Sequence, residues 1–246
     1  MGLAGAVLVP GLATAGNAAG AQVKAPAATC PSASACAAPW MAHVTNLTLG
    51  RTPTDSDYGT MSATADPDEA TRSRTARRLL TSLEGRRFTV ELQYWKVLQR
   101  GPDPSGADFW PRALVDGRRN AELLEGSLLG SHEFSRRWPD WITQMYDVVL
   151  ARRPDPDGLA YWRDQATRST QERVARRFLA TAAARRERSR IVHASLLAQI
   201  TDDPGRPTAG EIAHGASLLA RFTGEDDLIV ELLSSEETYI ACQSET

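Results

Sequence analysis

The chain has 246 residues, of which 42% are hydrophobic and 24% are charged, as in an ordinary globular protein. Its formal net charge of −2 gives no electrostatic basis for binding nucleic acid or an anionic membrane, so neither partner is expected. This length accommodates one large domain or two small ones.

The N-terminal residues 1–21 are small and apolar, and they end in Ala19-Gly20-Ala21. An apolar run before a small-x-small site is typical of a signal peptide, although the usual basic start is missing. We therefore expect residues 1–21 to be a signal peptide and the protein to be secreted or at the cell surface. The run is too short to span a bilayer, and no membrane span is expected elsewhere. Residues 22–39 are rich in Gly, Ala, Ser and Pro and are predicted to be a flexible linker.

Three cysteines allow more than one disulfide. Cys30 and Cys36 are close together in the predicted linker, and Cys242 is near the other end of the chain. In an oxidising compartment, two of them should pair. Cys30–Cys36 is the local option, whereas Cys36–Cys242 would join the two ends; three unpaired thiols remain the third alternative.

Residues 40–87 are predicted to form a degenerate N-terminal helical repeat. Leu49–Pro53 matches Leu150–Pro154, and Ala76–Thr81 matches Ala175–Ala180. In this unit, Asp66 followed by Pro67 predicts a helix start.

Residues 88–138 are predicted to form the next repeat. Leu92, Trp95 and Leu98 fall on one helical face, and the 100–110 stretch then supplies an Asp-Pro helix start at Asp103. Ser131 is predicted to cap a further helix.

Residues 139–190 form the clearest predicted repeat, around the stretch Arg152–Trp162. Asp155 is a good N-cap, and Pro156 suits the first helical position because its missing N–H is not needed there. Tyr161 and Trp162 follow as large apolar side chains. Ser169 with Glu172 reads as a capping box for the next helix.

Residues 191–246 are predicted to form a degenerate C-terminal repeat. The copy at 206–214 keeps a glycine, Gly210, spaced by 52 residues from Gly158, which is itself 52 residues from Gly106. Terminal repeats of an array are expected to diverge because one face meets solvent.

Similarity at a nearly fixed spacing indicates a repeat array, and no stretch alternates apolar and polar residues for long enough to predict a strand. The fold class expected is all-α, with tandem helical repeats of about 50 residues sharing a continuous core.

The signature Arg-x-Pro-Asp-x-x-Gly-x-x-Tyr/Phe-Trp, at Arg152–Trp162 and at Arg100–Trp110, resembles that of a bacterial family. It is similar to the tandem repeats of domain-of-unknown-function 4214, found mostly in secreted and cell-surface proteins. The resemblance implies a helical module like the phycobilisome linker domain, export and an interaction role, and it carries over no catalytic residue.

The sequence contains no Gly-x-Ser-x-Gly elbow and no phosphate-binding glycine loop, so no catalytic residue is assigned. Asp155, Asp157 and Gly158 lack the further acids of a calcium loop, and the histidines are scattered, so neither a metal nor a cofactor is expected. A carboxylate pair for glycoside hydrolysis has no sequence spacing of its own and stays open as an alternative.

Aromatic and arginine side chains are the remaining candidates for ligand or partner contact. Most aromatic residues recur on apolar faces and are expected in the core, but Trp138 and Trp141 flank Pro139 and are predicted to be an exposed pair. The second candidate set is an arginine cluster at Arg173, Arg176, Arg177, Arg185 and Arg186, of which the first three are the candidate contacts, with an earlier counterpart at Arg72, Arg74, Arg77 and Arg78. A solvated face is the plain interpretation of both clusters, and binding of an anionic polymer is the sharper one.

These observations predict a secreted, non-enzymatic interaction module whose partner is an extracellular protein or an anionic glycan. The alternative is a cell-wall or polysaccharide hydrolase. The oligomeric state is left open.

Overall fold

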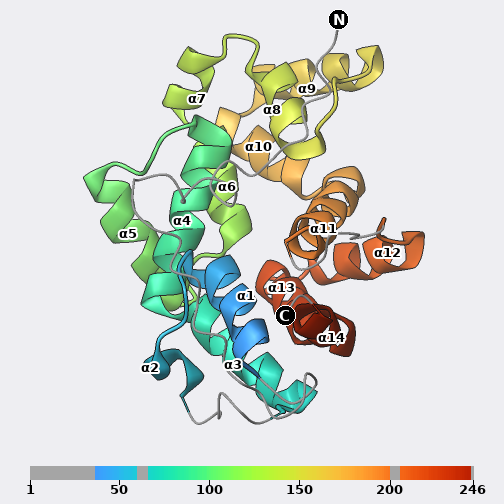
Figure 1. The fold of residues 1–246 in the computed structure, drawn as a ribbon. Helices are drawn as coiled ribbons and strands as arrows, with labels where there is room; N and C mark the ends of the chain where they lie inside the picture. Colours follow the sequence, from blue (N-terminus) through green and yellow to red (C-terminus); the bar gives the residue numbers. More distant parts are fainter. Residues whose placement is uncertain (1–36, 60–65, 200–205, 245–246) are drawn as a thin grey trace, which may run out of the picture.

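A computed structural model describes residues 37–59, 66–199 and 206–244 (Figure 1). These residues form helices joined by turns and contain no strand, which confirms the all-α prediction. The predicted signal peptide, Cys30 and Cys36 lie outside the described residues. So does most of the predicted linker, except that the first helix begins at Ala37, inside its predicted range.

The helices follow one another in four groups. The first group contains α1 (Ala37–Leu49), α2 (Asp55–Tyr58), α3 (Glu69–Thr81) and α4 (Leu83–Leu98). The second group starts with α4 and adds α5 (Pro104–Val115), α6 (Ala121–Leu129) and α7 (His132–Arg137). The third group contains α8 (Trp141–Leu150), α9 (Pro156–Arg168), α10 (Gln171–Leu179) and α11 (Ala182–Leu197). The fourth group starts with α11 and adds α12 (Ala209–Leu218), α13 (Gly224–Ser234) and α14 (Glu236–Ser244).

Neighbouring groups therefore share helices. The predicted boundaries at 87/88 and 190/191 fall inside α4 and α11, which are continuous helices of 16 residues each. Each of these two helices is the last helix of one group and the first helix of the next. The chain therefore has no break between these groups.

The second and third groups have the same helix start, 52 residues apart. The side chain of Asp103 accepts a hydrogen bond from the Gly106 N–H at 2.9 Å, and that of Asp155 accepts one from Gly158 at 2.8 Å. Pro follows both aspartates at the first helical position. The Asp-Pro caps of α5 and α9 are thus as predicted.

The glycine in this start leaves room for a buried tyrosine. A Cβ atom at Gly106 would lie 2.2 Å from the hydroxyl oxygen of Tyr94, and one at Gly158 would lie 2.5 Å from that of Tyr146. Gly210 has different surroundings: it is exposed, and only the Thr208 hydroxyl comes near it, at 3.8 Å from a Cβ atom. Thr208 is the N-cap, so Gly210 is the second helical residue, whereas Gly158 is the third. The expected equivalence of Gly210 was therefore wrong.

Two other predicted helix starts are displaced. The N-cap of α3 is Asp68 rather than Asp66, and its carboxylate accepts from Thr71 N at 2.8 Å. The N-cap of α10 is Thr170 rather than Ser169, with its hydroxyl accepting from Arg173 N. The Ser131 cap of α7 is confirmed, since its hydroxyl accepts from Phe134 N at 3.1 Å.

The buried apolar side chains form two main clusters instead of one continuous core. The larger cluster joins the second and third groups, and its fully buried members include Phe134, Met145 and Phe178. The smaller one joins the first and fourth groups, through α1, α3, α11, α13 and α14. This pairing follows from two helix contacts, α6 against α10 and α3 against α13.

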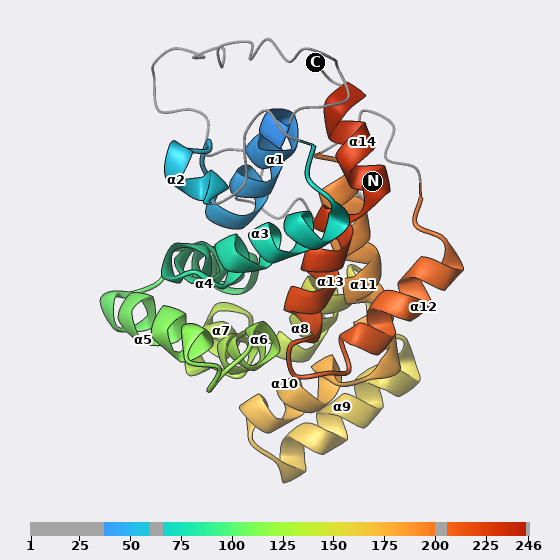
Figure 2. The same ribbon diagram turned by 90° about the horizontal axis from the view of Figure 1, so that it is seen from below.

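The first and fourth groups thus cover each other, contrary to the expectation that terminal repeats expose a face. The indole N–H of Trp40 donates to the carbonyl oxygen of Leu233 at 2.7 Å, and the buried Arg72 donates to that of Ser234 at 2.8 Å. Figures 1 and 2 both show α1 and α3 beside α13 and α14. The two ends of the helical chain are joined by polar as well as apolar contacts.

The third group opens differently from its neighbours. A single long helix, α4 or α11, follows the caps Ser82 and Thr181, but after Ser131 the helix stops at Arg137 and α8 starts only at Trp141. Pro139 explains the break, because it has no N–H for a helical hydrogen bond and disfavours helical angles at Trp138. Trp138 indeed has extended angles, φ −125° and ψ 95°.

Candidate functional site

The break between α7 and α8 borders a hollow on the surface. Its lining comes from the first turn of α8 and from one face of α9: Pro139, Asp140, Trp141, Ile142, Arg163 and Ala166. The hollow measures about 740 Å³, including the part open to solvent. A continuous helix like α4 or α11 would not present its first turn in this way, so the hollow follows directly from Pro139.

The hollow combines an aromatic side chain with two opposite charges. Trp141 is half-buried, with its inner side against the larger core cluster. Arg163 approaches Asp140 at 3.5 Å, and both side chains are more than half exposed, at 58% and 56%. A hydrogen bond from Thr143, followed by the charge of Arg163, holds the pKa of Asp140 below its usual value. The carboxylate therefore stays charged at neutral pH and can accept hydrogen bonds from a ligand.

Trp138 lies on the other side of the break and does not line the hollow. Its ring packs against Phe134 at 4.9 Å between centroids, and the guanidinium of Arg137 lies over it at 5.1 Å. Like Trp141, it is half-buried. The two tryptophans, predicted to be an exposed pair, are thus both half-buried, and only Trp141 lines the hollow.

The predicted arginine face on α10 is exposed but divided. Arg176 pairs with Glu172 at 2.6 Å, with its aliphatic stem close to Gly126 of α6. Arg177 points to the opposite neighbour and donates to Gln165 of α9 at 2.9 Å. Arg173 is exposed between them. In the earlier counterpart on α3, Arg72 is buried, whereas Arg74, Arg77 and Arg78 are exposed, and Arg77 pairs with Asp227 of α13 at 2.9 Å.

The aromatic residues of the repeated signature separate into buried and exposed members. Trp162 is 7% exposed and packs edge-on against Phe178 at 5.2 Å, as expected for a core residue. Its neighbour Tyr161 is 55% exposed, and the equivalent Phe109 is 50% exposed, so the expectation of core packing was wrong for these two. Trp95, at 39%, is exposed as well.

The hollow and the α10 face both lie within the segment that comparison with known families identifies. Residues 125–182 match the model of the family described as "Domain of unknown function (DUF4214)". This segment is a DUF4214-like helical domain. It runs from the middle of α6 to the first residue of α11 and includes the whole Arg152–Trp162 stretch. No curated protein and no solved structure matches the chain.

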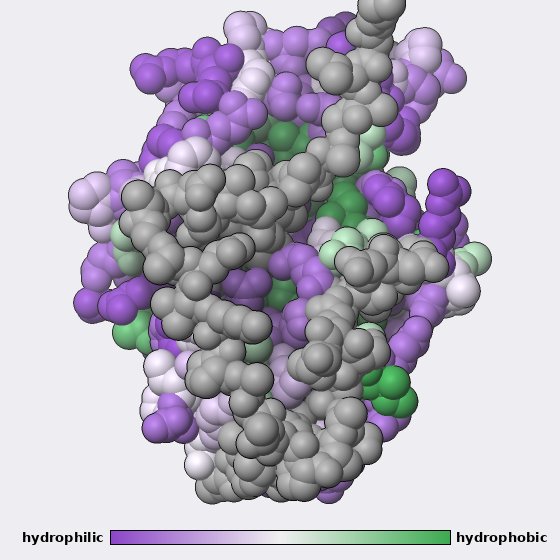
Figure 3. Space-filling view, viewed as in Figure 1, coloured by the Kyte–Doolittle hydropathy of each residue, from purple (hydrophilic) through white to green (hydrophobic). Residues whose placement is uncertain are grey.

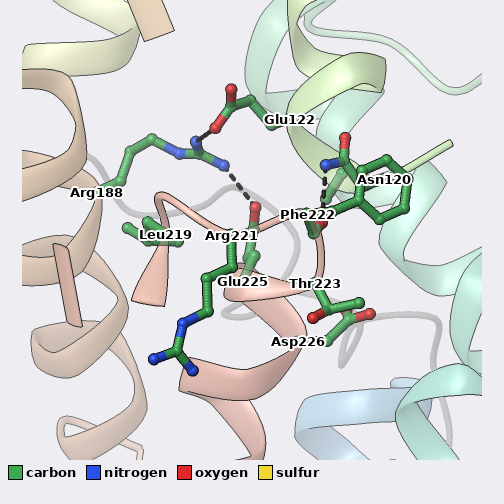
Figure 4. Close-up of a pocket in the computed structure, with 10 residues that line it drawn as sticks. Asn120, Glu122, Arg188, Leu219, Arg221, Phe222, Thr223, Glu225 and Asp226 are labelled. Atoms are coloured by element: carbon green, nitrogen blue, oxygen red, sulfur yellow. Dashed lines mark hydrogen bonds and ion pairs between the residues drawn. The ribbon is translucent and has the colours of Figure 1, made fainter. Parts of the chain in front are cut away.

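A second polar site lies where the DUF4214-like domain meets the fourth group. Arg188 of α11 is almost fully buried and reaches Glu122 at 3.0 Å and Glu225 at 2.5 Å (Figure 4). It also approaches a third carboxylate, that of Glu125, at 3.6 Å. Lys96 of α4 binds the far side of Glu125 at 2.7 Å. The adjoining pocket measures about 270 Å³, including the part open to solvent. It is lined by Asn120, Ala121, Glu122, Arg188, Leu219, Arg221, Phe222, Thr223, Glu225 and Asp226.

The carboxylates of this site have opposite pKa shifts. Burial would raise the pKa of Glu125, but the charges of Lys96 and Arg188 outweigh burial and lower it. Burial dominates for Glu225, whose pKa is raised although Arg188 opposes the change. The difference follows from charge balance, because two cations face three carboxylates and the third is left without full compensation.

Sequence reasoning did not single out Glu125 or Arg188, although each had a signal. Glu125 stands on the same helical face as Leu128 and Leu129, and Arg188 on that of Ala184 and Val192. A lone charge on an apolar face indicates a buried charge with a partner from another helix.

The remaining predictions concern the disulfide, metal binding and membrane spans. Cys242 is buried in the smaller core cluster together with Ala37, the residue that follows Cys36 in the sequence. The disulfide stays a prediction, since its other candidates lie outside the described residues. Within the described part of the chain, no group of three or more His, Cys, Asp or Glu residues is suited to hold a metal ion. None of the helices described there has the length and apolarity that a bilayer crossing needs.

Proposed function

We propose that the protein is an exported, non-enzymatic interaction module that binds an anionic polysaccharide at the cell envelope or outside it. The observation that carries this proposal is the hollow at the α7–α8 break. It is lined by the half-buried Trp141 together with a charged donor, Arg163, and a charged acceptor, Asp140. Aromatic rings bind the apolar faces of sugars, and charged side chains bind their hydroxyl and acid groups.

The surface around the DUF4214-like domain supports the choice of an anionic ligand. Hydrophilic side chains predominate at the end of the molecule that carries α7, α8 and α9 (Figure 3). Only some of the arginines on this domain pair with a carboxylate from another helix, and Arg173 on α10 is exposed. Arginine forks suit carboxylate and phosphate groups. Export is supported by the sequence of residues 1–21 alone.

The proposal is tested by titrating the protein with polygalacturonate, using neutral dextran as the comparison polymer. Trp141→Ala should weaken binding by about tenfold, equal to about 1.4 kcal/mol. Trp138→Ala is the matched control, because it removes an equally half-buried indole on the other side of Pro139 without touching the hollow. Equal losses of polygalacturonate affinity in the two variants would show that the hollow is not the binding site. Binding of a protein by both variants would favour a protein partner instead of a polysaccharide.

A hydrolase is the second candidate, and Glu225 is the observation in its favour. A carboxyl group with a raised pKa beside a pocket is a suitable general acid. Two features favour a structural role instead. Glu225 is bound by Arg188, and the pocket is smaller than the roughly 300–1,000 Å³ usual for ligand sites.

The hydrolase is tested by incubating the purified protein with cell-wall and acidic polysaccharides and measuring new reducing ends. Turnover that Glu225→Gln abolishes, with folding retained, would establish the enzyme. Binding of the polymer without turnover is the result that the interaction module predicts.

A further inference from the structure

An arginine after the first helix of a group binds a glutamate at the start of a later helix. In the first group, Arg51 Nε donates to Glu84 Oε1 at 2.6 Å, with Nη2 on the second oxygen at 3.0 Å. In the second group, Arg100 binds both oxygens of Glu133 in the same way, at 2.6 and 2.5 Å. In both pairs the partners are 33 residues apart. Each glutamate is the second residue of its helix, α4 or α7.

A second arginine flanks each of these glutamates. The hydrogen bonds from Arg51 lower the pKa of Glu84, and the charge of Arg87 lowers it further. Glu133 has a lowered pKa for the same reason, with Arg100 as the main cause and Arg136 adding to it. Both flanking arginines stand three residues after the glutamate. In both groups, therefore, one arginine binds the carboxylate through both oxygens, and a second arginine adds its charge from one helical turn further on.

In the third group, the first arginine is present in the same geometry. Arg152 lies over Tyr146 at 5.3 Å, as Arg100 lies over Tyr94 at 5.4 Å. It approaches the capping Asp155 at 3.7 Å, the distance at which Arg100 approaches Asp103. The side chain of Arg152 thus makes the same two contacts as that of Arg100, which binds a glutamate in the second group.

The carboxylate that would complete this arrangement is missing from the sequence. The second residue of α11 is Ala183, which is exposed and lies 31 residues after Arg152 (183 − 152), two fewer than the spacing in the first two groups. Arg186 stands three residues after Ala183, as the flanking arginine stands three residues after the glutamate in those groups. As a result, the side chain of Arg152 is 51% exposed, against 35% for Arg100. Two further arginines adjoin the two positions in sequence, Arg153 and Arg185, and the Nε of Arg185 is buried with no hydrogen-bond partner among the described residues.

We propose that Arg152 and Arg186 form a binding site for a carboxylate group of an acidic polysaccharide. This inference rests on the proposed function and names the chemical class of the ligand, a polymer of uronic acid. The first two groups show that the arrangement fits a carboxylate bound by both oxygens. A single exposed pair contributes only about 0–1 kcal/mol, so a polymer with many carboxylates fits the exposed arginines better than a small acid does.

The test returns the missing carboxylate to the chain. Ala183→Glu should form the same ion pair with Arg152 that Glu133 forms with Arg100, and should weaken binding of polygalacturonate by about tenfold at low salt. Ala182→Glu is the matched control, because it adds the same charge at the neighbouring exposed residue. It should leave most of the affinity in place. Equal losses in the two variants would mean that only net charge matters and would overturn the site.

A gain of binding provides an independent check. Glu133→Ala removes the internal carboxylate from Arg100 and Arg136 and should create a second site, seen as a higher binding stoichiometry for short galacturonate oligomers. No gain in this variant, together with no loss in Ala183→Glu, would refute the inference. Folding of each variant is checked by its circular dichroism and unfolding midpoint.

The outcomes separate this inference from the proposed function. Binding that depends on Trp141 but not on position 183 would keep the polysaccharide function and remove the arginine site. Poly-L-glutamate that binds more tightly than polygalacturonate and with the same dependence on position 183 would assign the site to an acidic protein, which overturns the sugar ligand. Failure of the unmodified protein to bind any carboxylate polymer would overturn both.

Discussion

The carboxylate of Glu125 is fully buried, and both of its cations come from other helices, Lys96 from α4 and Arg188 from α11. Burying a charge is costly unless partners compensate it, so these side chains must come together when the halves of the molecule do. Glu225 shares Arg188 but has a raised pKa, whereas that of Glu125 is lowered. Two carboxylates at one arginine therefore contribute to stability with opposite dependence on pH.

Glu125→Gln should lower the free energy of unfolding by about 3–5 kcal/mol at pH 7, because it leaves buried cations without their partner. The pKa of Glu125 is lowered in the folded state, so its stabilisation is present above the unfolded value of about 4.3 and is lost as the pH falls below it. The difference from the unmodified protein in urea unfolding should accordingly shrink below about pH 4.3.

Glu225→Gln is the control for this change. The pKa of Glu225 is raised in the folded state, so its charged form destabilises the fold. The contribution of Glu225 to stability therefore becomes more favourable as the pH falls. We expect a much smaller loss than for Glu125→Gln at pH 7. Equal losses would contradict the charge balance described for this site.

Trp162→Ala should cost about 3–5 kcal/mol, because the ring is buried against Tyr146 and Phe178. Tyr161→Ala, one residue away and exposed, should change stability by less than about 1 kcal/mol. Thermal or urea unfolding of the two variants checks both values. A loss below about 1 kcal/mol for Trp162 would show that its ring does not support the core.

At the scale of single elements, the helix starts show what the sequence could predict. Asp103, Asp155 and Ser131 were correctly identified as N-caps, because a capping hydrogen bond spans only three residues and its residue types are few. Asp66 and Ser169 were wrong by two residues and one residue, since a second capping residue stands beside each. The exposure of Trp95 and Phe109 could not be predicted from helical spacing alone, because it depends on whether a neighbouring helix covers that face.

The glycine of the helix start should respond differently in α9 and α12. Gly158→Ala should lower stability by about 1–3 kcal/mol, because its Cβ would collide with the Tyr146 hydroxyl, which has little freedom to move. Gly210→Ala meets nothing closer than 3.8 Å and should raise stability by up to about 1 kcal/mol, since alanine favours a helix. Similar unfolding midpoints for the two variants would contradict the difference in their surroundings.

At the scale of the whole molecule, the first and fourth helix groups close on each other, and the second and third share the larger core. Sequence similarity predicted helical groups but not this pairing. Its contacts join residues as far apart as Trp40 and Leu233, and local patterns carry no information about such distances. The third group differs from the first two at two points, the Pro139 break and Ala183 in place of glutamate. The Pro139 break exposes polar groups within the DUF4214-like domain, whereas Ala183 and Arg186 lie just after its last residue, in the first turns of α11.

The central claim is that these two departures mark the surface that binds an acidic polysaccharide. It is tested most directly by mapping amide chemical-shift changes in the isotope-labelled protein during titration with galacturonate oligomers. We predict the largest changes around residues 139–142, 152–153, 163 and 183–186, with little change in α1, α3, α13 and α14. Changes centred on the Arg188 pocket or on the first and fourth groups, or no changes at saturating oligomer, would contradict the account.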